Sequence, residues 1–141
     1  MYDTFHPEQP VGLMDFVKAA RSRIQEVSSA DLQRMAAERP DLLILDVREG
    51  SEHEQGHIEG ALLVPRGILE AAADPAYPKH QETLVAARNR PIVAYCATGG
   101  RSAMAAAVLQ MMGFKEVYSL AGGFGAWEQA GLPVVREARY V

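Results

Sequence analysis

Cys96 is the single cysteine of the chain, and it opens the segment Cys96-Ala97-Thr98-Gly99-Gly100-Arg101-Ser102. The two glycines allow a tight turn whose N–H groups point inward, and Arg101 adds a fixed positive charge. A lone cysteine is otherwise most often an inert buried side chain, so the interpretation depends on this loop. Cysteines beside a cation at a helix start have a lowered pKa. The segment therefore predicts a nucleophilic thiolate with a pKa below the free value of about 8.5.

The elements that must position this loop are short apolar runs that alternate with helical patterns. Strand-like runs cover 42–47, 61–64, 92–95 and, more weakly, 116–120. Helical spacing covers 13–24, 68–73, 81–89, 102–112 and 122–130, and another helix is expected between Ser28, with Asp31 in its first turn, and Pro40. This alternation predicts an α/β domain on a mainly parallel sheet, in which ligands bind at the carboxyl ends of the strands.

Four further side chains fall at or near those strand ends. Asp46 lies at the end of the 42–47 run and Arg48 directly follows it. Arg66 follows Pro65, and Ser102 begins the helix after the cysteine loop. They are candidates for a pocket wall, although Asp46 and Arg48 also suit a structural ion pair, and Ser102 suits the support of a first helical turn. Phe124 and Trp127 are expected in the core.

Four segments in order resemble signatures of the rhodanese family of single-domain sulfurtransferases, over about residues 28 to 135. They are Asp46-Val47-Arg48-Glu49, Gly56-His57-Ile58-Glu59-Gly60-Ala61, the Cys96–Arg101 loop, and Leu120-Ala121-Gly122-Gly123-Phe124-Gly125-Ala126-Trp127. The resemblance implies a three-layer domain with a central, mainly parallel sheet of about five strands and helices on both faces. We expect an N-terminal extension with an amphipathic helix over 1–27, the rhodanese-like domain over 28–135 and a tail over 136–141.

The resemblance also implies a chemistry. Cys96 would take a sulfane sulfur from thiosulfate or a persulfide, and would pass it to cyanide or a thiol. Arg101 would orient the donor, and the backbone of Ala97, Thr98, Gly99 and Gly100 would bind it. No cofactor is expected, because the cysteine itself supplies covalent catalysis. The family often has a basic or polar residue after the cysteine, whereas this chain has Ala97, which favours a persulfide over thiosulfate as the donor.

Two other functions remain as alternatives. The first is a sulfur carrier, sensor or partner-binding module without turnover, which the helix over 13–24 would suit. The second is a phosphatase or arsenate reductase, whose loops resemble this one but have five residues between cysteine and arginine. Here four residues lie between Cys96 and Arg101, and the smaller loop should fit one sulfur atom better than a tetrahedral oxyanion.

His53-Glu54-Gln55-Gly56-His57 has the spacing of a zinc-protease helix, but Gly56 within it is unfavourable to a helix. The other histidines, His6 and His80, lie in expected loops and make poor third ligands. We therefore expect no metal site, and we expect His57 to tie the following turn through hydrogen bonds.

Composition restricts the partners. The formal net charge of −4 and pI of about 5.5 argue against nucleic acid and anionic membranes, and we see neither a secretory signal nor an apolar run of membrane-span length. The expected partners are a small sulfur donor and a thiol or cyanide acceptor, with a sulfur-relay protein as a further candidate. We expect a cytoplasmic protein, and the sequence leaves open whether it is a monomer or a homodimer.

Overall fold

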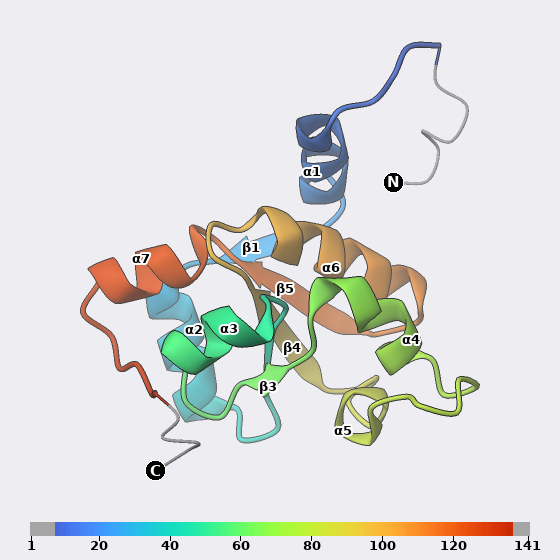
Figure 1. Cartoon of the computed structure of the whole chain (residues 1–141). Helices are drawn as coiled ribbons and strands as arrows, with labels where there is room; N and C mark the ends of the chain where they lie inside the picture. The colour runs from blue at the N-terminus through green and yellow to red at the C-terminus, as the bar shows by residue number, and fades with distance from the viewer. Residues whose placement is uncertain (1–7, 137–141) are drawn as a thin grey trace.

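The computed structural model describes residues 8–136, in which five parallel strands form one sheet (Figure 1). The strands run in the order β1-β5-β4-β2-β3. Their bounds are β1 (Gln25–Val27), β2 (Leu43–Asp46), β3 (Leu62–Leu63), β4 (Pro91–Tyr95) and β5 (Glu116–Leu120). All five residues of β4 are buried, as expected for the central strand of a parallel sheet covered on both faces. The predicted α/β class and parallel sheet are confirmed.

Helices cover both faces of the sheet. Their bounds are α1 (Leu13–Arg21), α2 (Ser29–Glu38), α3 (Gly50–Gln55), the 3-10 turn η2 (Arg66–Ile68), α4 (Leu69–Ala73), α5 (Glu82–Val85), α6 (Gly100–Met111) and α7 (Gly123–Gln129). On one face, α4, α5 and α6 pack against apolar side chains such as Leu45 and Ile92. On the other face, α2 and α7 pack against Val93 and Tyr95, whose positions in β4 alternate with Ile92 and Ala94.

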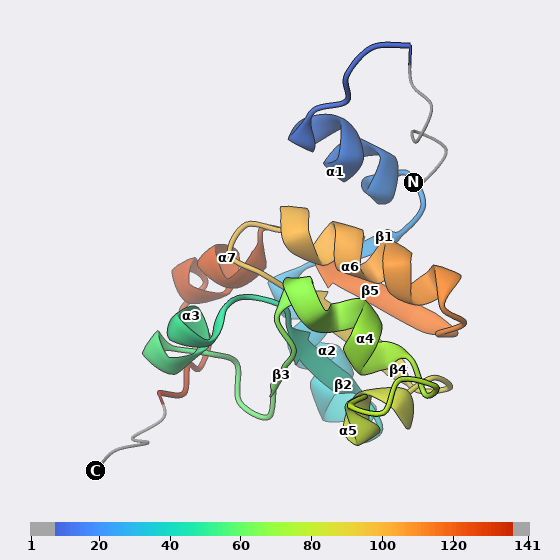
Figure 2. The same ribbon diagram turned by 45° about the vertical axis from the view of Figure 1, so that its right-hand side comes forward.

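Helix α1 lies outside these three layers. It packs on the outer side of α6, above that helix in both views (Figures 1 and 2). At the contact, Ala20 of α1 clusters with Ala103 and Ala107 of α6, and the larger side chains of Phe16 and Met104 pack against this cluster. Leu13 and Met14, by contrast, remain 67% and 63% exposed. The first turn of α1 therefore presents apolar side chains that the described fold leaves uncovered.

Local sequence signals explain several boundaries. Ser28 caps α2, since its hydroxyl accepts a hydrogen bond from the Asp31 N–H at 3.0 Å and the Asp31 carboxylate accepts one from the Ser28 N–H. Gly113 and Gly131 follow α6 and α7 with φ of +93° and +72°, the left-handed conformation that commonly ends a helix. These start and stop positions match the predictions.

Three elements differ from the predictions, and the first is the short helix α3, which was not expected. β1 was not expected, because its three residues, Gln-Glu-Val, have no apolar run, yet they pair in parallel with β5 at one edge of the sheet. The helix expected over 81–89 is only α5, which Gln81 caps by accepting hydrogen bonds from the N–H groups of Thr83 and Leu84. The expected tail over 136–141 lies outside the described residues except for Arg136, and 1–7 also lie outside them. Within the described chain, no helix is long and apolar enough to cross a membrane.

Candidate active site

The cysteine loop connects the end of β4 to the start of α6. Cys96 directly follows the last residue of β4, and Gly100 begins α6. Gly99, the residue before α6, has φ of +110°, a conformation that side chains disfavour and glycine adopts readily. The loop therefore turns back sharply, so that the first amides of α6 face the cysteine.

The sulfur of Cys96 lies at the focus of this turn. The N–H of Gly99 donates to Sγ at 3.1 Å, and the N–H of Ser102 donates at 3.4 Å. Burial of the residue, which is 1% exposed, would by itself raise the pKa of the thiol. The hydrogen bonds from the Ser102 hydroxyl and from the amides of Ser102, Gly99 and Thr98 outweigh burial, so the pKa of Cys96 is lowered. The sulfur is thus covered, but main-chain donors are aimed at it.

A second hydroxyl supports this environment from β5. Ser102 Oγ lies 3.6 Å from Cys96 Sγ and 2.8 Å from Ser119 Oγ, and both serines are fully buried. When the thiolate is ionised, the Ser102 hydroxyl can donate to the sulfur while it accepts from Ser119. Sequence analysis missed Ser119, although a polar residue in a buried strand, opposite Ala94 of β4, was an available signal.

The start of α7 holds the outer side of the loop. The N–H of Phe124 donates to the Cys96 carbonyl at 2.7 Å, and the N–H of Gly125 donates to the Ala97 carbonyl at 3.1 Å. Gly123, with φ of +61°, comes so close that a Cβ there would stand 2.5 Å from the Cys96 carbonyl oxygen. The loop carbonyls are therefore turned outward toward α7. Sequence analysis correctly predicted Phe124 in the core, but it did not predict the two hydrogen bonds from α7 to the loop.

Arg101 is held by a carboxylate that sequence analysis did not find. Its guanidinium donates to the two oxygens of Glu52 on α3, at 2.9 and 3.1 Å. The hydrogen bond to Glu52 is the main cause that raises the pKa of Arg101, and the nearby Cys96 adds to it. The same pairing lowers the pKa of Glu52. No local sequence signal joins these residues, which lie 49 positions apart.

Asp46 and Arg48 form a buried ion pair. Arg48 donates from Nε and Nη2 to the two Asp46 oxygens at 3.0 and 2.9 Å, and His53 Nδ1 and the Tyr95 hydroxyl also contact Asp46 Oδ2. Burial opposes ionisation of Asp46, but the hydrogen bonds from Arg48 and His53 outweigh it and lower its pKa. Asp46 is 0% exposed, so it joins Arg48, His53 and Tyr95 beneath the surface and does not form a pocket wall.

The two histidines of the zinc-like motif do not lie on one helix. α3 ends at Gln55, and His57 lies beyond it, stacked on the His53 ring at 3.7 Å between centroids. His57 Nδ1 contacts the His53 carbonyl, and its main chain pairs with Val135, so it ties the turn to the C-terminal segment. Among the described residues, no three potential metal ligands come together.

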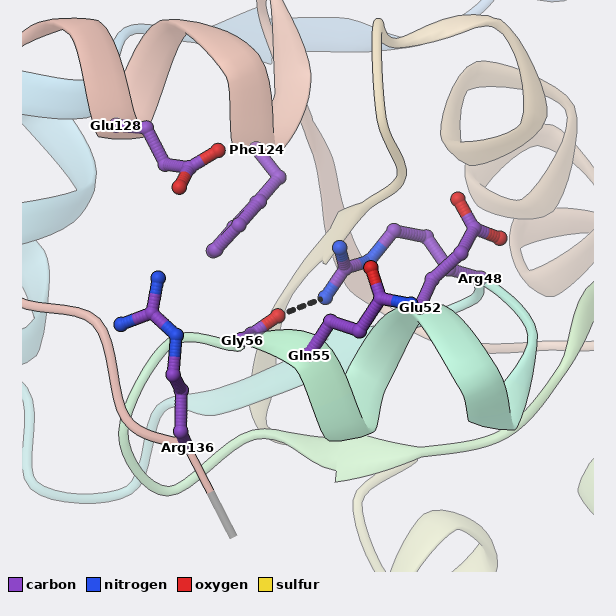
Figure 3. A pocket seen from close by; sticks show the side chains of 7 residues that line it. All are labelled: Arg48, Glu52, Gln55, Gly56, Phe124, Glu128 and Arg136. Carbon is purple, nitrogen blue, oxygen red and sulfur yellow. Dashed lines mark hydrogen bonds between the residues drawn. The ribbon is translucent and has the colours of Figure 1, made fainter.

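Two cavities each include one partner of the Glu52–Arg101 pair, Glu52 in the first and Arg101 in the second. The first, of about 340 Å³, is drawn in Figure 3. Glu52 and Gln55 line it from α3, Phe124 and Glu128 from α7, and Arg136 from the C-terminal segment. The Glu52 carboxylate points away from its centre, and Arg48 donates to the Gly56 carbonyl at 2.7 Å (Figure 3). The second, of about 400 Å³, lies between α1 and the loop.

The remaining predicted residues take different positions. Thr98 is exposed and Ala97 is half-buried, so both lie at the outer rim of the loop. Thr98, Gly100 and Arg101 line the second cavity. Arg66 begins η2, where its guanidinium pairs with Glu70 at 2.8 Å. Taken together, the site offers a stabilised thiolate, a ring of donors and one paired cation, which suits nucleophilic attack on a polarisable anion.

Several known proteins are similar to this chain in sequence. A family described as the rhodanese-like domain matches residues 28–130. A sulfurtransferase from Allochromatium vinosum is 34% identical over 112 residues, which are 79% of this chain and 95% of that protein. A tRNA uridine(34) hydroxylase from Pectobacterium carotovorum is 35% identical over 102 residues, but these span 72% of this chain and only 28% of that longer protein.

A solved structure with a related backbone comes from Rhodopseudomonas palustris. That protein is described as having unknown function and as a "possible tyrosine phosphatase". It superimposes with a TM-score of 0.82 at 36% identity, covering 90% of this chain and 98% of that one.

Proposed function

This chain belongs to the rhodanese family, and we propose that it is a sulfurtransferase that carries a sulfane sulfur as a persulfide on Cys96. The observation that carries the proposal is the set of N–H donors on Cys96 Sγ, led by Gly99 at 3.1 Å. They favour the ionised sulfur despite its burial, and an ionised sulfur is the nucleophile that this chemistry needs. The similarity to a sulfurtransferase over 79% of the chain supports the same reaction class.

The reaction is proposed in two steps. The Cys96 thiolate attacks the outer sulfur of the donor and forms a new S–S bond. The old S–S bond breaks, and its electron pair leaves on sulfite when thiosulfate is the donor. In the second step, cyanide or a thiolate attacks the outer sulfur of the persulfide, and Cys96 leaves as a thiolate. The persulfide is an anion, so the amides that stabilise the thiolate can also stabilise it.

The contacts support the catalytic assignments that we propose. Cys96 is the nucleophile, the main chain of Ala97 to Gly100 surrounds the transferred sulfur, and Arg101 faces the donor. Ser102 acts as a positioning residue, because its amide and hydroxyl both approach the sulfur. We propose a cytoplasmic location, where reducing conditions keep a single thiol free.

A turnover assay separates this proposal from a carrier without turnover. Thiosulfate and cyanide should yield many equivalents of thiocyanate per protein, and Cys96→Ala should reduce the rate to the uncatalysed background. Release of a single equivalent of sulfite followed by no thiocyanate would favour the carrier. The exposed Leu13 and Met14 on α1 are the feature that would suit a partner of such a carrier.

The phosphatase alternative has its own test. Four residues separate Cys96 from Arg101, and Arg101 is already paired with Glu52. A dianionic phosphate ester would therefore meet a small loop and a neutralised cation. We expect no hydrolysis of para-nitrophenyl phosphate above the Cys96→Ala background, and hydrolysis that depends on Cys96 would favour the phosphatase.

A further inference from the structure

The cavity between α1 and the cysteine loop shares Thr98, Gly100 and Arg101 with the proposed active site. Its volume of about 400 Å³ lies within the range of small-molecule sites. Thr98, Gly100 and Arg101 form one wall, so the cavity opens on the same loop that holds Cys96. The opposite wall is α1, which lies outside the segment matched to the family, 28–130. This wall of the cavity therefore comes from a segment outside the family match, whereas the opposite wall is the family's cysteine loop.

The lining of this cavity is largely apolar. Leu13, Met14 and Val17 contribute from α1, and Met104 contributes from α6. Leu13 and Met14 are mostly exposed, which places apolar surface in water without a partner in the described fold. Methionine side chains are flexible and polarisable, and they adapt to ligands of irregular shape, sulfur compounds and aromatic rings among them. The lining thus favours an apolar group on the ligand.

The charges around the cavity argue against a small dianion. Its two cations are Arg21 and Arg101, and each already faces a carboxylate. Arg101 is paired with Glu52 through two hydrogen bonds, and Arg21 Nε lies 3.7 Å from Glu26. Arg21 also reaches the loop, because a Cβ on Gly99 would stand 3.5 Å from its Nη2. Two partly neutralised cations suit one negative charge better than two.

We propose that this cavity binds the apolar substituent of an organic sulfane-sulfur donor that carries a single negative charge, such as a thiosulfonate or an organic persulfide. The proposal rests on the proposed function and specifies its substrate class. With a thiosulfonate, the Cys96 thiolate attacks the outer sulfur and forms the Cys96 persulfide. The S–S bond of the donor breaks, and its electron pair leaves on the organic sulfinate.

Two donors with the same reactive group test the proposal. Benzenethiosulfonate and methanethiosulfonate have equal charge and differ in their apolar substituent. The measured quantity is the ratio of their kcat/KM values, in which a general change in the reactivity of Cys96 cancels. In the wild-type protein the ratio should favour the benzene compound. In the double variant Leu13→Gln, Met14→Gln the ratio should fall about 5-fold or more, because apolar contact area is lost.

Two further variants keep the test decisive. Met111→Gln changes another methionine that is more than half exposed, at the far end of α6 and outside the cavity, and it should leave the ratio unchanged. Met104→Gln removes an apolar side chain from the opposite wall, so it should also lower the ratio. It serves as the test if the α1 variant does not fold. Cys96 persulfidation by both donors with an unchanged ratio in the folded wall variants would overturn the cavity proposal alone. Persulfidation by neither donor would overturn the proposed function, and the cavity proposal with it.

Discussion

The guanidinium of Arg101 and the carboxylate of Glu52 meet in a two-bond ion pair beside the cysteine loop, at 2.9 and 3.1 Å. Arg101 is the only residue of the loop with a charged side chain at neutral pH apart from the ionised cysteine. Glu52 lies on α3 and lines the cavity drawn in Figure 3, whereas Arg101 lines the cavity beside α1. The charge that a donor meets at this site is therefore set by two elements that are far apart in the sequence.

Glu52→Gln should improve the use of thiosulfate. The substitution removes a negative charge while it keeps a polar side chain, so more of the Arg101 charge becomes available to a dianion. We expect KM for thiosulfate to fall about threefold or more, with a steeper dependence on salt. Steady-state kinetics at two ionic strengths provide the measurement. Glu38→Gln makes the same charge change on the exposed end of α2 and should have no effect. An unchanged or higher KM in Glu52→Gln would contradict this account of the pair.

The lowered pKa of Cys96 predicts a pH profile for alkylation. Only the thiolate reacts with iodoacetamide, so the rate should rise with a midpoint below the free value of about 8.5. Ser102→Ala removes the hydroxyl that contributes most to lowering the pKa. Its midpoint should therefore move up toward 8.5, and alkylation at neutral pH should slow by about 10-fold. A midpoint at or above 8.5 in the wild-type protein would contradict the description of the sulfur environment.

Ser119→Ala provides the matched comparison for that experiment. It removes the hydroxyl that contacts Ser102 at 2.8 Å, but it does not touch the sulfur. The alkylation midpoint should shift in the same direction as in Ser102→Ala, and by less. A larger shift than in Ser102→Ala would contradict the view that Ser119 acts on the sulfur only through Ser102.

Gly123→Ala should destabilise the protein more than another glycine substitution with similar backbone strain. A Cβ at Gly123 would stand 2.5 Å from the Cys96 carbonyl oxygen, whereas one at Gly131 meets nothing within 4 Å. Both glycines have positive φ, so Gly131→Ala measures the conformational cost alone, about 1–2 kcal/mol. Urea unfolding should show a loss of stability at least about 1 kcal/mol larger for Gly123→Ala. Equal losses would show that α7 does not hold the loop as tightly as described.

The elements that sequence analysis identified well are those with strong local patterns. The short apolar runs predicted β2 and β4, because a parallel strand that is covered on both faces has no polar side. The Ser28–Asp31 cap and Gly113 marked helix ends for equally local reasons. The position of Cys96 followed from one rule about the carboxyl ends of parallel strands.

What could not be predicted depends on contacts between distant segments. β1 is too short and polar to stand out, and it becomes a strand because β5 offers an unpaired edge. Glu52 is one of several acidic residues near its position, and only the packing of α3 against the loop selects it as the partner of Arg101. The burial of Cys96 could not be predicted either, because it arises from the packing of both α6 and α7 around the loop.

Intact-mass spectrometry after incubation with thiosulfate and removal of excess donor tests sulfur capture by Cys96 most directly. The account predicts a gain of about 32 Da per chain, which maps to Cys96, is absent in Cys96→Ala and is removed by cyanide or a thiol. Benzenethiosulfonate should produce the same gain, since the same sulfur atom is transferred. An unchanged mass with both donors, in protein whose Cys96 is shown by alkylation to be reduced, would contradict the account.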